Sequence, residues 1–359
     1  MRNPSITTHP ALSAPARNRA ILLSPNRQML CFLAFMVMLW TVLCAVSHRS
    51  PDADGMEQLV WAASLELGYY KHPPFPTWVM YLLTHVFGRP YWLSFFAGML
   101  SSALGLWFVW LLGKEMATAR HAFIATALVS TTIYFSSRGT IYNHNTAQFW
   151  SITASTWLLY RALRYRQACA WLWLGVVSAL AVMTKYSIVL QWAGFFLFML
   201  RQRCFAQAGT WKGLGMAAAA FVVCVSPHLW WLFDHRFLPL DYAGNAIDMP
   251  SRLQGLLLII HFALDQLARL SPMLAVWLAW LWWARISAGR AKSAAADSRA
   301  WQPAATERER PTRYIHHFDE WDRSFLLWVG LTPVIATLLA SALMGTRLIA
   351  SWATTFFVL

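Results

Sequence analysis

Long uninterrupted apolar runs alternate with short polar segments along almost the whole chain. The runs lie at 29–47, 91–113, 121–137, 146–160, 170–184, 186–200, 214–233, 255–284 and 324–343, and another begins at residue 350. Most are near the roughly 20 residues that a helix needs to cross a bilayer. The apolar residues are continuous rather than alternating, which favours helices over the strands of a closed barrel. The pattern predicts an all-α polytopic membrane protein with about nine to ten spans.

Composition agrees with this class and excludes an ordinary soluble domain. Hydrophobic residues make up 58% of the 359 residues and charged residues only 12%, whereas soluble domains carry about 25%. The net charge of +14 is explained by topology: with a cytoplasmic N-terminus, 20 of the 29 lysines and arginines fall on the inner side. The positive-inside rule therefore favours this orientation, and no nucleic-acid partner is predicted.

The polar segments divide the chain into four parts. Residues 1–28 read as a disordered cytoplasmic tail. Residues 29–284 form a transmembrane bundle that includes a first outer loop at 48–90, and 285–323 form a basic cytoplasmic linker. Residues 324–359 carry further spans, and the chain ends within an apolar run, so we expect a truncated last helix. The run at 255–284 is expected to cross the membrane once, because a single crossing puts the basic linker on the inner side.

The first outer loop contains the unusual stretch "DADGMEQLVWAASLELGYYKHPPFPTW" at 52–78. Asp54 followed by Glu57 is a capping-box pattern, which predicts an interfacial helix that starts at Asp54 and runs on through Leu65. Lys71 and His72 precede a Pro-Pro pair, and cations beside a rigid turn suit a phosphate contact. Solvation of these cations at the interface is the alternative.

Other polar residues lie where predicted spans reach the outer side. Arg138 and Lys185 have little loop around them, and charges at such depth are costly and often functional, although snorkelling to lipid headgroups is the alternative. Asn143 and Asn145 begin a span, where Asn145 could simply cap a helix. Carboxylates gathered near cations suit a reaction that deprotonates a hydroxyl and expels a phosphate. A lipid-linked phosphate donor would explain a site in a membrane.

Metal binding is a further alternative for the polar residues on the outer side. The outer side carries several residue types that bind metals, namely Asp54, Glu57, His144, His228, Asp234 and His235. Their spacing matches no H-x-x-x-H or similar pattern, so no metal site is predicted. A divalent metal cofactor stays open, and no other cofactor is indicated.

The motifs, taken in order, resemble glycosyltransferase family 39, which includes bacterial relatives of protein O-mannosyltransferases and the aminoarabinose transferases. The first motif is a frame D-x-x-E…W…L-x-x-G-Y-Y-x-H-P-P…W from Asp54 to Trp78. It is followed by "YNHNTAQFW", "ALAVMTKYSIVL", "SPHLWWLFDHRF" and "GTRLIASW". Together the motifs cover residues 50 to 352, nearly the whole chain.

The resemblance implies a GT-C-type helix bundle in the bacterial inner membrane, with a periplasmic active site. It implies inverting transfer of a sugar from a polyprenyl-phosphate donor to a lipid, glycan or protein acceptor. Membrane lipids are further implied partners. By position, Asp54 becomes the catalytic base. The candidate donor-phosphate contacts are Lys185, Arg347, Arg138, Lys71 and His72, and the candidate substrate contacts are Glu57, Tyr70, Asn143 and Asn145.

The sequence departs from the family pattern at several of these positions. Gly55 stands where many members have Glu, and His72 stands where aminoarabinose transferases have Lys directly before Pro-Pro. Asn143 or Asn145 replaces a second acidic residue. These differences argue against the aminoarabinose substrate. A non-enzymatic lipid-sugar carrier, or an inactive truncated relative, is the alternative function, although transporters concentrate broken spans at mid-membrane rather than polar groups at one surface.

Overall fold

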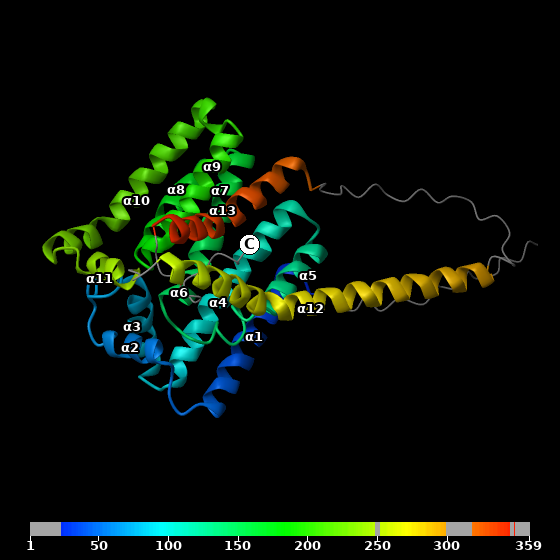
Figure 1. Ribbon diagram of the computed structural model, residues 1–359, viewed down its shortest axis with the longest axis horizontal. Helices are drawn as coiled ribbons and strands as arrows, with labels where there is room; N and C mark the ends of the chain where they lie inside the picture. Colours follow the sequence, from blue (N-terminus) through cyan, green and yellow to red (C-terminus); the bar gives the residue numbers. More distant parts are fainter. Residues whose placement is uncertain (1–22, 248–251, 299–317, 345–347, 349–359) are drawn as a thin grey trace, which may run out of the picture.

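The computed structural model describes residues 23–247, 252–298, 318–344 and 348. These residues form helices joined by turns, and no strand occurs among them, which confirms the predicted all-α class (Figure 1). The α-helices are α1 (Pro25–Ser47), α2 (Ala53–Trp61), α3 (Phe75–Phe87), α4 (Trp92–Met116), α5 (Ala119–Ser130), α6 (His144–Ala147), α7 (Phe149–Arg164), α8 (Ala168–Val182), α9 (Val189–Arg201), α10 (Ala208–Asp234), α11 (Leu238–Ile247), α12 (Arg252–Ser298) and α13 (Glu320–Met344). Two short 3₁₀ helices, η1 (Tyr186–Ile188) and η2 (Cys204–Ala206), flank α9.

Each of the nine complete apolar runs overlaps a helix. Within the described residues, five helices are long and apolar enough to cross a bilayer: α1, α4, α10, the 257–288 part of α12, and α13. The helices α8 and η1–α9 are apolar but shorter. The chain is therefore a multi-pass membrane protein, and α12 carries the single long run that the sequence predicts before the linker.

The helices differ from the sequence prediction in three places. The run at 121–137 is helical only to Ser130, because the hydroxyls of Thr131 and Thr132 donate to carbonyls three residues earlier, at 2.7 and 2.8 Å, and turns follow. The helix α3 arises in the outer loop, directly after Pro-Pro and with Pro76 in its first turn, where proline is favoured. Residues 285–298, assigned to the linker, continue α12.

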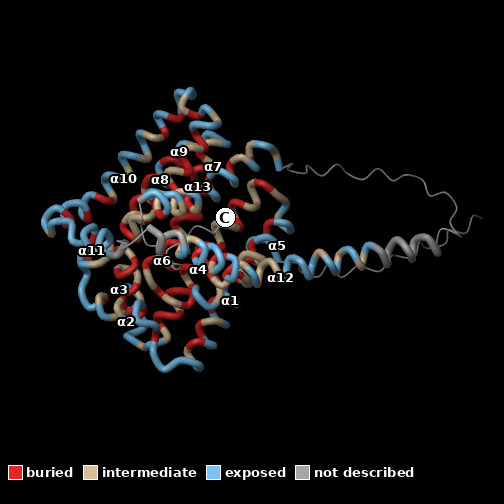
Figure 2. The backbone as a smooth tube through the Cα atoms, in the orientation of Figure 1, coloured by how far each residue is buried: buried red, intermediate tan, exposed pale blue. Residues whose placement is uncertain are grey.

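Buried residues concentrate along α4, α7 and α8, whereas α12 is mostly exposed or half-buried over 257–288 (Figure 2). Small residues allow the central helices to approach closely. A Cβ atom on Gly175 of α8 would lie 2.1 Å from the carbonyl oxygen of Ala217 on α10, so the two backbones touch at this point. Close contact at small residues is a common way to pack helices in a membrane.

We expect Gly175→Leu to destabilise the bundle, because the side chain cannot enter without separating α8 from α10. Overpacking of this kind costs about 1–3 kcal/mol. Thermal denaturation of the detergent-purified protein should show a lower midpoint. Gly215→Leu is the matched control, because a Cβ atom on Gly215 of α10 meets nothing within 4 Å. Equal midpoints for the two variants would contradict this account of the contact.

Candidate active site

The outer-loop helix α2 begins one residue before Asp54, and its cap is a different residue from the one predicted. The side chain of Asp52 accepts from the backbone N–H of Asp54 at 3.2 Å, so Asp52 is the N-cap. The predicted capping box of Asp54 and Glu57 is wrong, because Asp52 already has the extended backbone that a cap requires. The carboxylate of Asp54 therefore lies in the first turn, exposed and not used for capping.

The segment after α2 folds back instead of continuing as a helix through Leu65. The Trp61 ring, at the end of α2, stacks on the Tyr69 ring with centroids 5.0 Å apart. The Tyr69 hydroxyl in turn donates to the carbonyl of Ser64 at 2.9 Å. These contacts close a turn at 62–74, after which α3 packs against α2.

The helix α2 lies directly against α4 and α3. A Cβ atom on Gly55 would be 2.3 Å from the hydroxyl oxygen of Ser94 on α4. On the same side of α2, the buried Gln58 accepts from the hydroxyl of Thr77 at 2.9 Å. This packing gives a physical reason for Gly rather than Glu at position 55: a Cβ atom would displace the Ser94 hydroxyl and would lie 3.1 Å from the Cβ atom of Pro51.

Asn143 fixes the direction of the Asp54 carboxylate. Its side-chain oxygen caps the short helix α6 by accepting from the backbone N–H groups of Asn145 and Thr146, at 2.9 and 3.1 Å. The cap is therefore Asn143, and the alternative of an Asn145 cap is wrong. Because the oxygen is engaged, the amide nitrogen faces away from the helix and donates to Asp54 Oδ2 at 2.9 Å.

Lys185 contacts the same segment, at Asn145. It follows α8, and its Nζ donates to Asn145 Oδ1 at 2.5 Å. Its backbone carbonyl accepts from the side chain of Gln148 at 2.8 Å. The side chain is half-buried, and burial lowers the pKa of Lys185 to about 8. Through Asn143 and Asn145, one short segment thus holds both Asp54 and Lys185.

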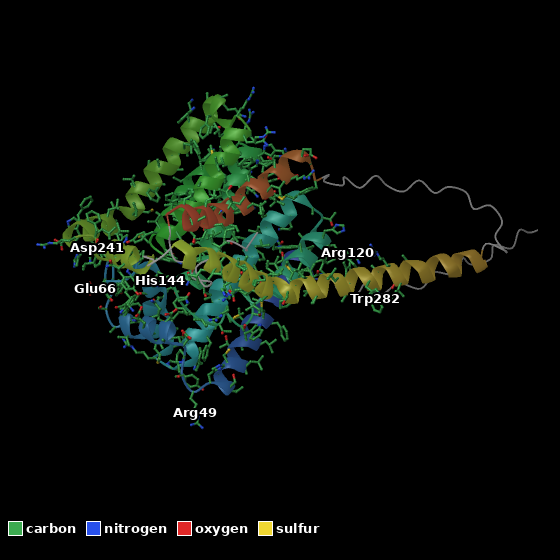
Figure 3. All side chains as sticks on the ribbon, viewed as in Figure 1. Arg49, Glu66, Arg120, His144, Asp241 and Trp282 are labelled. Atoms are coloured by element: carbon green, nitrogen blue, oxygen red, sulfur yellow. The ribbon has the colours of Figure 1, made fainter. Side chains whose placement is uncertain are left out.

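Two histidines lie beside this group. The rings of His72 and His144 have centroids 4.0 Å apart, and His144 is buried with its Nε2 3.3 Å from the carbonyl oxygen of Pro73. Figure 3 shows His144 on the side of the molecule that also carries Glu66 and Asp241. Burial lowers the pKa of His144, and burial together with the nearby lysines lowers that of His72 to about 3. Both imidazoles are neutral at pH 7, so His72 would meet a phosphate as a neutral donor.

The other outer-loop candidates form a second group next to the first. Lys71 pairs with Glu57 at 2.5 Å, and both side chains are 27% exposed. The Lys71 ammonium lies 5.9 Å from the ring centroids of Tyr70 and of Tyr242 on α11. Glu57 offsets the charge of Lys71, and the two tyrosine rings contact each other at 5.6 Å, which joins the outer loop to α11.

The two remaining arginines are less connected to this site. Arg138 is exposed in the turns before Asn143, and it forms no ion pair with any residue that the structure describes. Arg347 lies outside the described residues. The structure thus brings together Asp54, Asn143, Asn145, Lys185 and His72, with Glu57, Tyr70 and Lys71 next to them.

His228, for which the sequence predicted no structural role, holds this region together. His228 is fully buried in α10, with Nδ1 2.7 Å from the carbonyl oxygen of Leu67 and Nε2 3.0 Å from the hydroxyl of Tyr186. It therefore connects the outer loop to the residue after Lys185. A histidine directly after Pro227 within an apolar run was the signal for this role.

Known proteins resemble the chain in sequence. Residues 71–231 match the family model of dolichyl-phosphate-mannose-protein mannosyltransferases. The lipopolysaccharide core galacturonosyltransferase RgtB of Rhizobium johnstonii is 26% identical over 224 residues, which are 58% of this chain and 42% of that protein. The chain spans less than half of the length of this curated relative.

Solved structures share the fold. ArnT from Cupriavidus metallidurans bound to undecaprenyl phosphate aligns with a TM-score of 0.66 and 14% identity, over 93% of this chain and 59% of that one. The apo structure of ArnT aligns with a TM-score of 0.65 over 92% and 57% of the two chains. The sequence matches and the shared architecture agree with the resemblance drawn from the motifs: the chain is a multi-pass membrane protein with the helical fold of ArnT, and residues 71–231 are similar to the mannosyltransferase family.

Proposed function

We propose that the chain carries the catalytic bundle of an inverting glycosyltransferase, which moves a sugar from a polyprenyl-phosphate donor to an acceptor hydroxyl. Asp54 takes the proton of the acceptor hydroxyl, whose oxygen forms a bond to the anomeric carbon of the sugar. The bond from that carbon to the phosphate oxygen breaks, and polyprenyl phosphate leaves with the electron pair. The proton remains on Asp54 until it is lost to water.

One observation carries the proposal: Asp54 and Lys185 are both held by the segment from Asn143 to Asn145. Asn143 directs the carboxylate without neutralising it, so it remains available as a base. Lys185 supplies a positive charge that would stabilise the leaving phosphate. A base and a phosphate-binding cation at a fixed separation are the two groups that this reaction needs.

Release of polyprenyl phosphate is the measurement that tests the function, because this product is common to every donor sugar. Proteoliposomes containing the protein are supplied with polyprenyl-phosphate sugars and candidate acceptors. Because one relative is a lipopolysaccharide core galacturonosyltransferase, glycolipids are the first acceptors to try. We expect acceptor-dependent release. Donor binding without release, under conditions that support a known family member, would favour the carrier or inactive alternative.

We further propose that the N-terminus is cytoplasmic and the Asp54 site periplasmic, in the inner membrane. The distribution of basic residues supports this orientation. In a background without the five native cysteines, a cysteine in place of Asp52 should react with an impermeant thiol reagent in intact cells. A cysteine in place of Ser298, at the far end of α12, should react only after permeabilisation. The reverse pattern would place the site on the cytoplasmic side and contradict the proposal.

A further inference from the structure

A large cavity lies at the end of the bundle opposite Asp54. The helix α7 begins at Phe149, next to the Gln148 that contacts Lys185, and α8 returns to Lys185, so the turn between them is at the far end. The cavity measures about 730 Å³ and is lined by this turn, by the turn between α9 and α10, and by Trp321 of α13. With 16 residues at about 1.5 Å each, α7 separates the two ends by about 24 Å.

The cavity carries positive charge. Arg166 and Lys212 line it, both are exposed, and neither forms an ion pair within the described ranges. The three acidic residues next to Trp321 have other partners: Asp319 accepts from Arg164 at 2.6 Å, Glu320 pairs with Arg323 at 3.7 Å, and Asp322 accepts from a buried tyrosine hydroxyl at 2.8 Å. The two cations of the cavity are therefore available to an anion.

Two helices also begin at this cavity. Ala168 of α8 and residues 208–210 of α10 lie in its wall, and the N-cap residues of both helices, Gln167 and Gln207, make no side-chain cap hydrogen bond. The first N–H groups and the positive ends of the helix dipoles add to the attraction for an anion. This contribution supplements the two cations and does not replace them.

An apolar groove adjoins the cavity. It measures about 390 Å³, lies among α8, α9 and α10, and shares Trp171 with the charged cavity. Its other walls include Trp192, Phe196 and Phe221, and Ser178 supplies its one polar side chain. A charged cavity directly beside an apolar groove matches an amphiphile with an anionic head and a hydrocarbon chain better than a soluble phosphate.

We infer that this crevice binds an anionic glycerophospholipid from the leaflet at that end of the bundle. The phosphate lies between Arg166 and Lys212, and one acyl chain follows the groove past Trp171. The occupant is distinct from the donor lipid of the proposed reaction, because the Asp54 site is at the other end of α7. Such a lipid would fill the gap between the α7–α8 and α9–α10 turns.

Native mass spectrometry of the full chain in detergent tests the inference by titration with phosphatidylglycerol and with phosphatidylethanolamine of the same acyl chains. We expect the wild type to bind phosphatidylglycerol more tightly. Arg166→Gln with Lys212→Gln should weaken this binding about 100-fold, at about tenfold for each lost charge-assisted contact, and leave phosphatidylethanolamine unchanged. The matched control is Arg201→Gln with Arg120→Gln, which removes two exposed cations that do not line the cavity.

A second variant tests the groove without altering charge. Ala218 is exposed and lines the groove, so Ala218→Trp should fill it and weaken long-chain phosphatidylglycerol while dihexanoyl phosphatidylglycerol still binds. Equal phosphatidylglycerol affinity in the two double variants would overturn the inference. So would equal wild-type affinity for the two phospholipids, or a larger loss for polyprenyl phosphate than for phosphatidylglycerol, because the crevice would then hold the donor lipid.

Discussion

Replacing Asp54 by Asn is expected to reduce sugar transfer by about 10²- to 10⁴-fold, the range for loss of a general base. The substitution keeps the size of the side chain, and its amide oxygen can still accept the hydrogen bond that Asn143 now donates at 2.9 Å. The helix α2 keeps its cap, because that cap is Asp52. The charge and the basicity are therefore the only properties that the variant removes from this position.

The measurement is single-turnover release of polyprenyl phosphate by protein in proteoliposomes, at equal amounts of inserted protein. Asp52→Asn is the matched control: it removes a carboxylate two residues away and retains the ability to cap α2. We expect the control to stay within about threefold of the wild type, since it leaves the reacting groups in place. Turnover by Asp54→Asn within about tenfold of the wild type would assign the base to another residue.

The apolar runs predicted the helices because length and continuous hydrophobicity respond to one simple constraint, the thickness of the bilayer. The ends of the helices depend on finer chemistry. Threonine hydroxyls after Ser130 compete for backbone carbonyls and stop α5 early. The helix α3 has only 13 residues, too few to span, and a search for spans therefore passes over it.

The candidate site could be predicted as a set of residues but not as a set of contacts. Asp54 and Asn143 are 89 residues apart, and Lys185 and Asn145 are 40 apart. The first contact depends on the packing of α2 against α4 at Gly55, which sequence spacing does not show. The cap was assigned to the wrong residue because D-A-D offers two carboxylates, and only the backbone conformation at Asp52 distinguishes them.

The second large effect is expected at Lys185, and it depends on pH. Burial lowers the pKa of Lys185 to about 8, so the ammonium is present at pH 7 and is lost as the pH rises through 8. A phosphodiester donor keeps one negative charge throughout this range. If Lys185 holds the donor phosphate, kcat/KM for the donor should fall by roughly 30-fold between pH 7 and about pH 9.5, following the protonated fraction of Lys185. The decline is expected in kcat/KM, because the pH dependence of kcat/KM reports the pKa values of groups in the free enzyme.

The neighbouring groups do not produce this profile. The Glu57 carboxylate raises the pKa of Lys71, so Lys71 stays charged through the same window. The pKa of His72 is about 3, so His72 is neutral throughout. Lys71→Gln is therefore the control cation: it should retain the decline above pH 8.

Variants at position 185 separate a phosphate contact from headgroup snorkelling. Lys185→Gln should lose about 10- to 150-fold in kcat/KM at pH 7, the cost of about 1.5–3 kcal/mol for a charge-assisted contact. Its profile above pH 7 should be flat. Lys185→Arg should recover part of this loss, because a planar fork fits poorly where a compact ammonium donates to Asn145. Its profile should also be flat, since arginine stays protonated over the whole range. If Lys185→Gln stays within about twofold of the wild type and keeps the decline above pH 8, Lys185 only anchors the chain among lipid headgroups.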